Sequence, residues 1–193
     1  MGNARRKPRW AAVLIGLVAV LAVAACGGDG GDEASGDTTE RPETTDTTVA
    51  ETTTTISPEA EIEAAIATYY AMVDRVVQAP DPDDPEIAQR AMGTNRETVE
   101  SGFAQLAALG QYGRPGPNRS TTVLRATVSG DQANADVCEV DDGRLINSAS
   151  GDVIDDDVVT RLVVISLERV DGAWLVSRVD PTDSSWEGVS DCA

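Results

Sequence analysis

Residues 161–180 read RLVVISLERVDGAWLVSRVD, and this stretch decides the fold of the chain. Apolar and polar residues alternate on both sides of Asp171-Gly172, which is the pattern of two half-buried strands. An Asp-Gly pair between such runs is a strong hairpin signal, because both residues tolerate the positive φ of a tight turn. We therefore expect a long strand over residues 158–170 and a last strand over residues 174–180.

Two further strands are expected upstream of this hairpin. Period-2 alternation predicts them at residues 122–128 and 133–140, joined by a Gly-containing turn. The residues expected to share one face of the first strand are Thr122, Leu124, Ala126 and Val128. Residues 147–156 are expected to form a polar loop, and residues 181–193 an irregular tail.

The segment before residue 80 shows helical periodicity. Ser57 is a good N-cap residue and Pro58 suits the first helical position, so a first helix is expected over residues 57–78. Its apolar residues recur at helical spacing and form one face. They are Ile62, Ile66, Tyr69, Tyr70, Val73 and Val77.

Two more helices are expected between this segment and the strands. Asp84 would cap a short helix over residues 85–92. Thr94 and Glu97 have the spacing of a capping box, which would begin a third helix. Gly110 would end that helix, because Gly readily adopts the left-handed conformation of a helix terminus.

Helices followed by an antiparallel meander indicate an α+β chain, with N-terminal helices packed on a curved antiparallel sheet of about four strands. Over residues 58–183 this order, closed by the hairpin of residues 161–180, resembles the NTF2-like superfamily. That superfamily includes the SnoaL-like and ketosteroid-isomerase-like cones, and cystatin-like sheets share its shape. The resemblance implies a domain over residues 57–193, in which the sheet wraps around helix 57–78 and leaves a cone-shaped pocket.

The N-terminal residues have the organisation of an export signal. Residues 1–10 are Arg-rich and carry no acid, and residues 11–25 form an uninterrupted apolar run. A spanning helix needs about 20 residues, whereas the core of a signal needs about 7–15. Residues 21–27 resemble a bacterial lipobox, so we expect a signal peptide over residues 1–25 and a lipid such as palmitate on Cys26. The chain would then be a lipoprotein of the actinobacterial type; an uncleaved anchor is the alternative.

Residues 26–56 would contain the lipidated Cys and a tether. The segment is rich in Thr, Asp and Gly and has no hydrophobic periodicity, so it is expected to be disordered. As a flexible coil of about 30 residues it would average roughly 30 Å from end to end. It would separate the domain from the membrane, and glycosylation of its threonines is left open.

The chain is strongly acidic, with a formal net charge of -18. Four of its 15 basic residues precede Cys26 and none of its 33 acidic residues does, so the exported part is more acidic still. Such a surface repels nucleic acid, and no nucleic-acid partner is expected. The chain has no His, which removes the commonest general base and the commonest transition-metal ligand. We expect no cofactor.

Three cysteines are an odd number for an exported protein. If Cys26 is acylated, Cys138 and Cys192 remain in a compartment where oxidation is permitted. We predict a disulfide between them, which would attach the C-terminal tail to a strand. Two free thiols are the alternative.

Candidate pocket residues lie on the first helix and on the strands. Tyr69, Tyr70 and Asp74 lie on or near one side of the helix. Enzymes of the resembled family use Asp, Tyr, His or Arg inside the cone, so the resemblance implies that Asp74 could act as a base of raised pKa beside a phenol donor. Arg125 and Arg161 would bind an anionic ligand if they point inward. The same spacing is also that of an ordinary helix face.

Two other features have both a structural and a functional interpretation. Trp174, the sixth candidate pocket residue, is expected to pack at the start of a strand, and a ligand platform is the alternative. Loop acids could bind Ca²⁺ through carboxylate oxygens, but their spacing does not fit an EF-hand. We therefore expect solvated acids and no metal site. These acids are Asp81, Asp83, Asp84, Asp152, Asp155, Asp156 and Asp157.

These observations favour a lipid-anchored protein on the extracytoplasmic face of the cell membrane. Its domain is expected to be a non-catalytic module that binds a protein partner or a small apolar ligand. One alternative is a SnoaL-like or ketosteroid-isomerase-like enzyme acting on a small apolar substrate. Another is an acidic cation-binding or envelope-spacer protein. An enzyme requires a buried Asp or Tyr facing a cavity, whereas an interaction protein requires an accessible surface.

Overall fold

The structure is a computed structural model that describes residues 56–192. Helices precede all strands in this range, and they are α1 (Pro58–Val76), α2 (Pro85–Arg90) and α3 (Gly93–Leu109). The strands are β1 (Gln111–Arg114), β2 (Ser120–Ser129), β3 (Gln132–Asp141), β4 (Arg144–Asn147), β5 (Val153–Asp155), β6 (Val159–Val170) and β7 (Ala173–Glu187). The predicted α+β class is therefore confirmed. The predicted signal peptide, Cys26 and the tether up to residue 55 lie outside the described residues.

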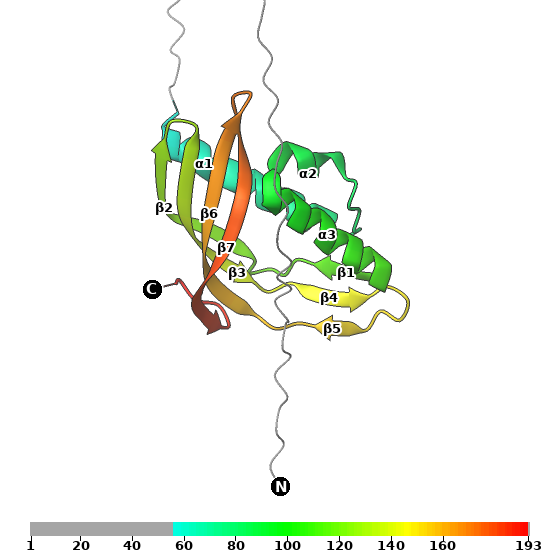
Figure 1. Ribbon diagram of the computed structural model, residues 1–193. Helices are drawn as coiled ribbons and strands as arrows, with labels where there is room; N and C mark the ends of the chain where they lie inside the picture. Colours follow the sequence, from blue (N-terminus) through cyan, green and yellow to red (C-terminus); the bar gives the residue numbers. More distant parts are fainter. Residues whose placement is uncertain (1–55, 193) are drawn as a thin grey trace, which may run out of the picture. The chain divides into compact units, whose positions relative to one another are not determined.

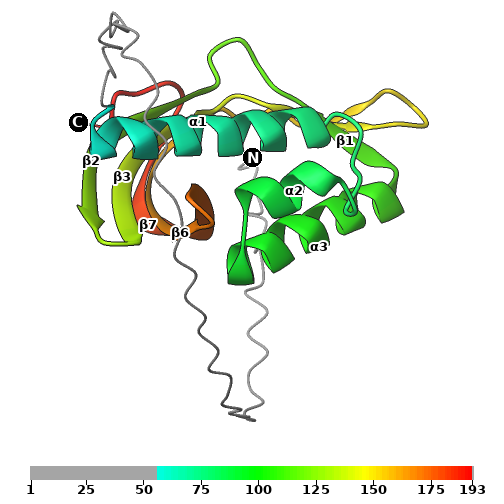
Figure 2. The same cartoon turned by 90° about the horizontal axis from the view of Figure 1, so that it is seen from above.

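The strands form two antiparallel sheets. The main sheet has the order β2-β3-β6-β7, and a smaller sheet has the order β1-β4-β5. Figures 1 and 2 show the main sheet curving around α1, as the NTF2-like resemblance implies, with α2 and α3 beside β7. Two register shifts between β6 and β7 and one between β2 and β3 interrupt the ladders. Such bulges increase the local bend of a sheet.

One hydrophobic core lies between α1 and the concave face of the main sheet. Apolar side chains alternate along β3 and β6, while α1 contributes residues at helical spacing. The most buried of them are Ile62, Ile66, Met72, Val76, Ile87, Val137, Val163, Ile165, Leu167 and Val176. The chain has only one Phe, three Tyr and three Trp, and the core is accordingly mainly aliphatic. No helix within residues 56–192 is long and apolar enough to cross a membrane.

The predicted helix caps are largely confirmed. The Ser57 hydroxyl accepts a hydrogen bond from the Ala60 N–H at 3.2 Å, and the Asp84 carboxylate accepts one from the Glu86 N–H at 2.9 Å. Gly110 follows α3 in the left-handed conformation, with φ 62° and ψ 41°. Each cap satisfies backbone groups that the helix itself leaves without a partner.

The junction between α2 and α3 differs from the prediction. Helix α2 ends at Arg90, and Ala91 is extended and forms a bridge to Val176 of β7. The Met92 N–H donates to the Val176 carbonyl at 3.0 Å, and Gly93, with φ 53°, starts α3 without a side-chain cap. The predicted capping box of Thr94 is therefore wrong, because this tertiary contact fixes the start of the helix.

The predicted face of β2 is also corrected. Val123 pairs with Val137 and Arg125 pairs with Asp136, so Leu124 is an extra residue in a β-bulge. The bulge reverses the alternation, and the side chain of Leu124 is 50% exposed rather than on the core face.

Two segments expected to be irregular, residues 153–155 and 181–187, form strands instead, and residues 111–114 form a further strand. Residues 111–114 and 153–155 pair with β4, and β7 continues through Pro181 to Glu187. Pro181 is tolerated because β7 is an edge strand and a register shift lies beside this residue. The pairings of residues 111–114 with β4 and of residues 181–187 with β6 are non-local and leave little local pattern.

Replacing Gly113 by Ala is expected to lower the free energy of unfolding by about 1–3 kcal/mol. A Cβ atom at this position would lie 2.5 Å from Cγ2 and 3.2 Å from Cγ1 of Val77, which is a branched side chain packed against the core. Gly102→Ala is the matched control, since its Cβ would meet no atom within 4 Å and α3 would gain helix propensity. Urea denaturation of both variants checks the prediction. A Gly113→Ala variant as stable as the native chain would contradict it.

Candidate functional site

Three of the predicted pocket residues meet in a charged cluster at the C-terminal half of α1. Tyr70 and Asp74 are one turn apart on the helix, and Arg161 lies on β6 opposite Glu139 of β3. The cluster also contains Arg119, from the loop before β2, and Asp141, from the end of β3. We call these six residues the Glu139 cluster.

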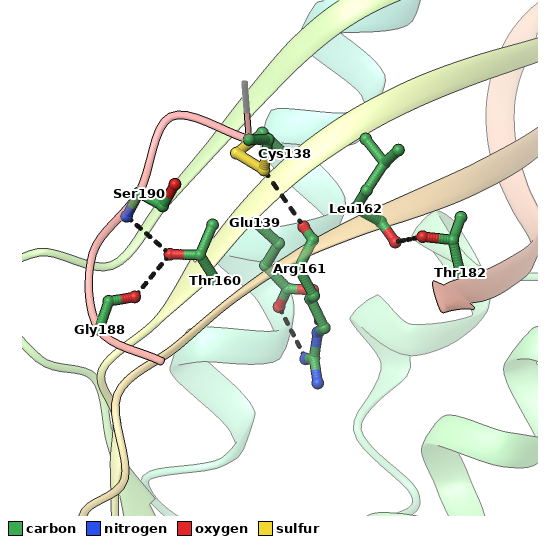
Figure 3. The surroundings of a disulfide bond; sticks show 9 residues. Cys138, Glu139, Thr160, Arg161, Leu162, Thr182, Gly188 and Ser190 are labelled. Atoms are coloured by element: carbon green, nitrogen blue, oxygen red, sulfur yellow. Dashed lines mark hydrogen bonds and ion pairs between the residues drawn. A yellow bond between two sulfur atoms is a disulfide. The ribbon is translucent and has the colours of Figure 1, made fainter. Parts of the chain in front are cut away.

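Glu139 lies at the centre of this cluster and is only 3% exposed. Arg161 donates from Nε to Glu139 Oε2 at 2.9 Å and from Nη2 to Oε1 at 3.1 Å, as Figure 3 shows in part. The Tyr70 hydroxyl donates to Oε2 at 3.4 Å. Arg119 Nη2 lies 3.9 Å from Oε1, so both oxygens of this carboxylate face cationic groups.

Arg119 joins the remaining acids of the cluster. Its Nε donates to Asp74 Oδ1, and its Nη1 donates to Asp141 Oδ1 at 2.8 Å. Arg161 Nη2 also lies 3.7 Å from Asp141 Oδ2. The side chain of Arg119 is 13% exposed, so the loop before β2 delivers a largely buried guanidinium into the cluster.

Burial shapes the acid–base properties of the cluster. It raises the pKa of the Tyr70 hydroxyl far above its usual value, and the charge of Glu139 acts in the same direction. Burial also raises the pKa of Asp74, against the opposing effect of Arg119. The hydrogen bond to Glu139 raises the pKa of Arg161. Tyr70 is therefore a permanent hydrogen-bond donor, and both guanidinium groups stay charged.

The free energy of unfolding of Asp74→Asn is expected to increase relative to that of the native chain as pH rises above 3.8, the usual pKa of Asp. Since the folded pKa is raised, the folded chain binds more protons than the unfolded chain in the window above 3.8, and stability is lost as pH rises through the folded pKa. Asp84→Asn is the control. Hydrogen bonds from Arg75 lower the pKa of Asp84, so the stability of this variant relative to the native chain should fall as pH rises. Urea denaturation between pH 3 and about pH 7 measures both variants; an Asp74→Asn difference that is independent of pH would contradict the prediction.

Tyr69 has a structural role next to the cluster. Its ring packs edge-on against Tyr70, with centroids 5.3 Å apart. Its hydroxyl donates to Asn95 Oδ1 at 3.3 Å, and Asn95 Nδ2 donates to the Val176 carbonyl at 3.2 Å. Tyr69 thereby connects α1 to α3 and β7.

Arg125 and Trp174 do not belong to the same site. The bulge turns Arg125 outward, where its side chain is 74% exposed and pairs with Asp136 at 2.7 Å. Trp174 is buried near the N-terminal end of α1, where its Nε1 donates to Glu61 at 3.2 Å and the Arg169 guanidinium lies 4.5 Å above its ring. Of the six candidate pocket residues, the structure brings Tyr70, Asp74 and Arg161 together, with Tyr69 beside them. It places Arg125 and Trp174 elsewhere.

A groove of about 360 Å³ lies instead between the start of α3 and strands β3, β6 and β7. None of the six predicted pocket residues lines it. Its lining is Met92, Gly93, Thr94, Gln132, Ala133, Asn134, Ser166, Leu167, Glu168, Ser177 and Arg178. Seven of these eleven residues are polar.

The predicted disulfide is present between Cys138 and Cys192, with an S–S distance of 2.05 Å. Figure 3 shows it next to the tail, which the Thr160 side chain also holds. The Thr160 hydroxyl donates to the Gly188 carbonyl at 2.8 Å and accepts from the Ser190 N–H at 2.9 Å. The C-terminal tail is thus attached to both β3 and β6.

The loop acids have identifiable local roles. Asp84 accepts two hydrogen bonds from Arg75, at 2.8 and 2.9 Å, in addition to capping α2. Asp81 and Asp155 accept hydrogen bonds from nearby backbone N–H groups in their own loops. Within residues 56–192, no group of three or more Cys, Asp or Glu side chains is arranged to hold a metal ion.

Sequence reasoning missed Arg119, Glu139 and Asp141. The sequence does contain one signal for Glu139. This residue is two and four positions from Val137 and Ala135 on β3, so its side chain lies on the same, core-facing side of the strand. A charged residue at such a position needs a partner of opposite charge. No local signal places Arg119 beside Asp74, because the loop conformation brings them together.

Comparisons with known proteins support the fold and do not identify a function. No family model and no curated protein matches the chain. The intermembrane-space region of the chloroplast protein ARC6 is similar, with a TM-score of 0.54 and 16% identity over 64% of this chain and 95% of that one. At this identity the likeness concerns the fold alone.

Two further solved structures are more distant. The protein Kfla4162 from Kribbella flavida has a TM-score of 0.49 and 13% identity, and covers 67% of this chain and 95% of its own. An NTF2-like protein with a cystatin-like fold from Novosphingobium aromaticivorans has a TM-score of 0.38 and 18% identity, over 63% and 80%. Likenesses at these TM-scores carry no functional argument.

Proposed function

We propose that the protein is an exported lipoprotein whose domain is a non-catalytic binding module, held on the extracytoplasmic face of the cell membrane by a lipid on Cys26. The observation that carries the non-catalytic part is the pairing of charges in the Glu139 cluster. Each of its three carboxylates faces at least one guanidinium within 4 Å.

This pairing disfavours proton transfer by the cluster. A general base needs a lone pair within reach of the substrate proton. Asp74 is the only acid of the cluster on α1, and its Oδ1 accepts a hydrogen bond from Arg119. Tyr70 already donates its proton to Glu139 and is buried. The cluster therefore supports the fold of the sheet around α1.

The core favours a protein partner over a small apolar ligand. The side chains of Ile66, Val137 and Ile165, which lie between α1 and the sheet, are at most 1% exposed and pack in one cluster. Because the interior is filled, a partner would bind to the outer surface of the domain. The acidic surface excludes nucleic acid as that partner.

The disulfide supports an exported location. Disulfides persist in oxidising compartments and are rare in the cytosol. The Cys138–Cys192 bond therefore agrees with a signal peptide over residues 1–25. It also leaves Cys26 as the remaining cysteine of the chain, at the position where a lipobox requires one.

Labelling with an alkyne-tagged palmitate tests the anchor in full-length chain produced in a bacterial host. We expect the native chain and Cys192→Ser to incorporate the label and to sediment with membranes. Cys26→Ser is expected to lose the label, whereas Cys192→Ser controls for the loss of a cysteine. Equal labelling of Cys26→Ser would contradict the proposed anchor.

Turnover of a β,γ-unsaturated ketosteroid tests the alternative enzyme. We expect no isomerisation above the uncatalysed rate, either by the native chain or by Asp74→Asn. Isomerisation by the native chain that Asp74→Asn abolishes would contradict the non-catalytic proposal. Isomerisation unaffected by Asp74→Asn would contradict it as well, and would place the active residues elsewhere.

A further inference from the structure

Strand β2 leaves one edge of the main sheet without a partner in the described chain. It pairs with β3 on one side only, and it is the terminal strand of the sheet order (Figure 1). Among residues 56–192, no backbone hydrogen bond outside the strand ladders involves residues 120–129. Over this length, backbone N–H and C=O groups at the free edge are available to another strand.

The free edge is unusual for its lack of negative charge. Residues 118–130 contain no Asp or Glu, in a chain that has 33 of them. Of the two arginines in this stretch, Arg119 is buried in the Glu139 cluster and Arg125 is paired with Asp136 on the neighbouring strand. Two copies of the chain can therefore approach along this edge with less repulsion than along an acidic surface.

The sequence of β2 is also partly the same in both directions, with four of its ten residues unchanged when it is reversed. It reads STTVL followed by RATVS. Antiparallel alignment of the strand with itself places Ser120 opposite Ser129, and Thr122 opposite Thr127. Threonine pairs across strands are favourable, and both of these threonines are exposed.

The bulge makes the faces of the two strands match in this alignment. Val123 lies before the bulge and Ala126 lies after it, and both pack against the core. In the self-pairing, Val123 of one copy is opposite Ala126 of the other, so core-facing residues meet core-facing residues. The two residues at the bulge, Leu124 and Arg125, oppose each other on the outer face.

We infer that β2 is an interaction surface for a second copy of this chain, which pairs with it antiparallel about a two-fold axis. The contact is isologous, since the same strand contributes both halves. It extends the main sheet of one copy into that of the other. A contact along one strand edge is smaller than a standard interface of about 1,600 Å², so the dimer is weak in dilute solution. Salt strengthens it by screening the acidic surfaces.

Cysteine cross-linking tests both the pairing and its register in full-length chain. The single variants Thr122→Cys and Thr127→Cys are each produced alone, and are also co-produced as two separate chains in one bacterial host. All samples are then oxidised under mild conditions. The paired Cβ atoms lie about 5 Å apart in the proposed register. The two copies of residue 122 lie about 17 Å apart, since five residues of a strand separate them. Mass spectrometry identifies the linked peptides, and it is applied to both the membrane and the soluble fractions of the cells.

We expect a mixed link between the cysteines introduced at positions 122 and 127 when the two variants are co-produced, and no link in either variant alone. We also expect Leu124→Asp to reduce the linked fraction at least fivefold, because it places a charge at the edge, while Ile154→Asp on β5 has no effect. Links formed equally in the single variants would overturn the register. Absence of any mixed link, with the native Cys138–Cys192 bond intact, would overturn the pairing itself.

Discussion

Replacing Glu139 by Gln is expected to lower the free energy of unfolding by about 2–4 kcal/mol. Removing one partner of a fully buried ion pair costs about 3–5 kcal/mol, because the other charge is left uncompensated. Glu139 is nearly inaccessible, with 4% of its side chain exposed, whereas that of Arg161 is 40% exposed. Water reaches Arg161 and reduces the cost below that of a fully buried pair. Chemical denaturation at neutral pH gives the value directly.

Asp136→Asn is the matched control for this variant. Asp136 lies on the same strand and pairs with an arginine at 2.7 Å, but Arg125 is 74% exposed. Exposed ion pairs contribute about 0–1 kcal/mol, so this variant should remain within about 1 kcal/mol of the native chain. Equal losses for the two variants would mean that the Glu139 cluster is no more important to stability than a surface pair.

Removing the disulfide is expected to have an effect of similar size. Cys138 and Cys192 are 54 residues apart, and closing a loop of that length constrains the unfolded chain by about 4 kcal/mol. For a domain of this size we expect Tm to fall on the order of 10 °C. Cys138→Ala with Cys192→Ala should show this fall in differential scanning calorimetry.

The same double variant should release the C-terminal tail. Residues 188–190 would then be held by two hydrogen bonds to Thr160 and by one from the Gly188 N–H to the Val158 carbonyl. We expect limited proteolysis to cleave the tail after residue 187 in the variant and to spare it in the native chain. An unchanged Tm together with a protected tail would show that the bond contributes nothing to the fold.

The sequence allowed the layers of this fold to be predicted, because its signals are local. Alternation around Asp171-Gly172 predicted the hairpin of β6 and β7, and Ser57 predicted the start of α1. The missed features depend on contacts between distant residues. The start of α3 follows from the hydrogen bond between Met92 and Val176, and the small sheet follows from the pairing of β1 with β4.

The candidate site was predicted only in part for the same reason. Tyr70 and Asp74 share a helix face, so their proximity follows from spacing alone. The outward position of Arg125 depends on a bulge that alternation does not reveal. The partners that decide the chemistry of the site, Arg119 and Glu139, come from a loop and from another strand. Asp74, which the family resemblance implies as a candidate base, thus lies in a cluster of paired charges.

A double-mutant cycle on Glu139 and Arg161 tests the central claim, that this cluster is a structural network and not an active site. The cycle compares Glu139→Gln, Arg161→Gln and the double variant by chemical denaturation. We expect each single variant to be less stable than the native chain, with a coupling energy of about 1–3 kcal/mol for residues in one network. Removal of catalytic groups often stabilises a protein, because active sites are strained. More stable single variants with a coupling energy near zero would contradict the claim.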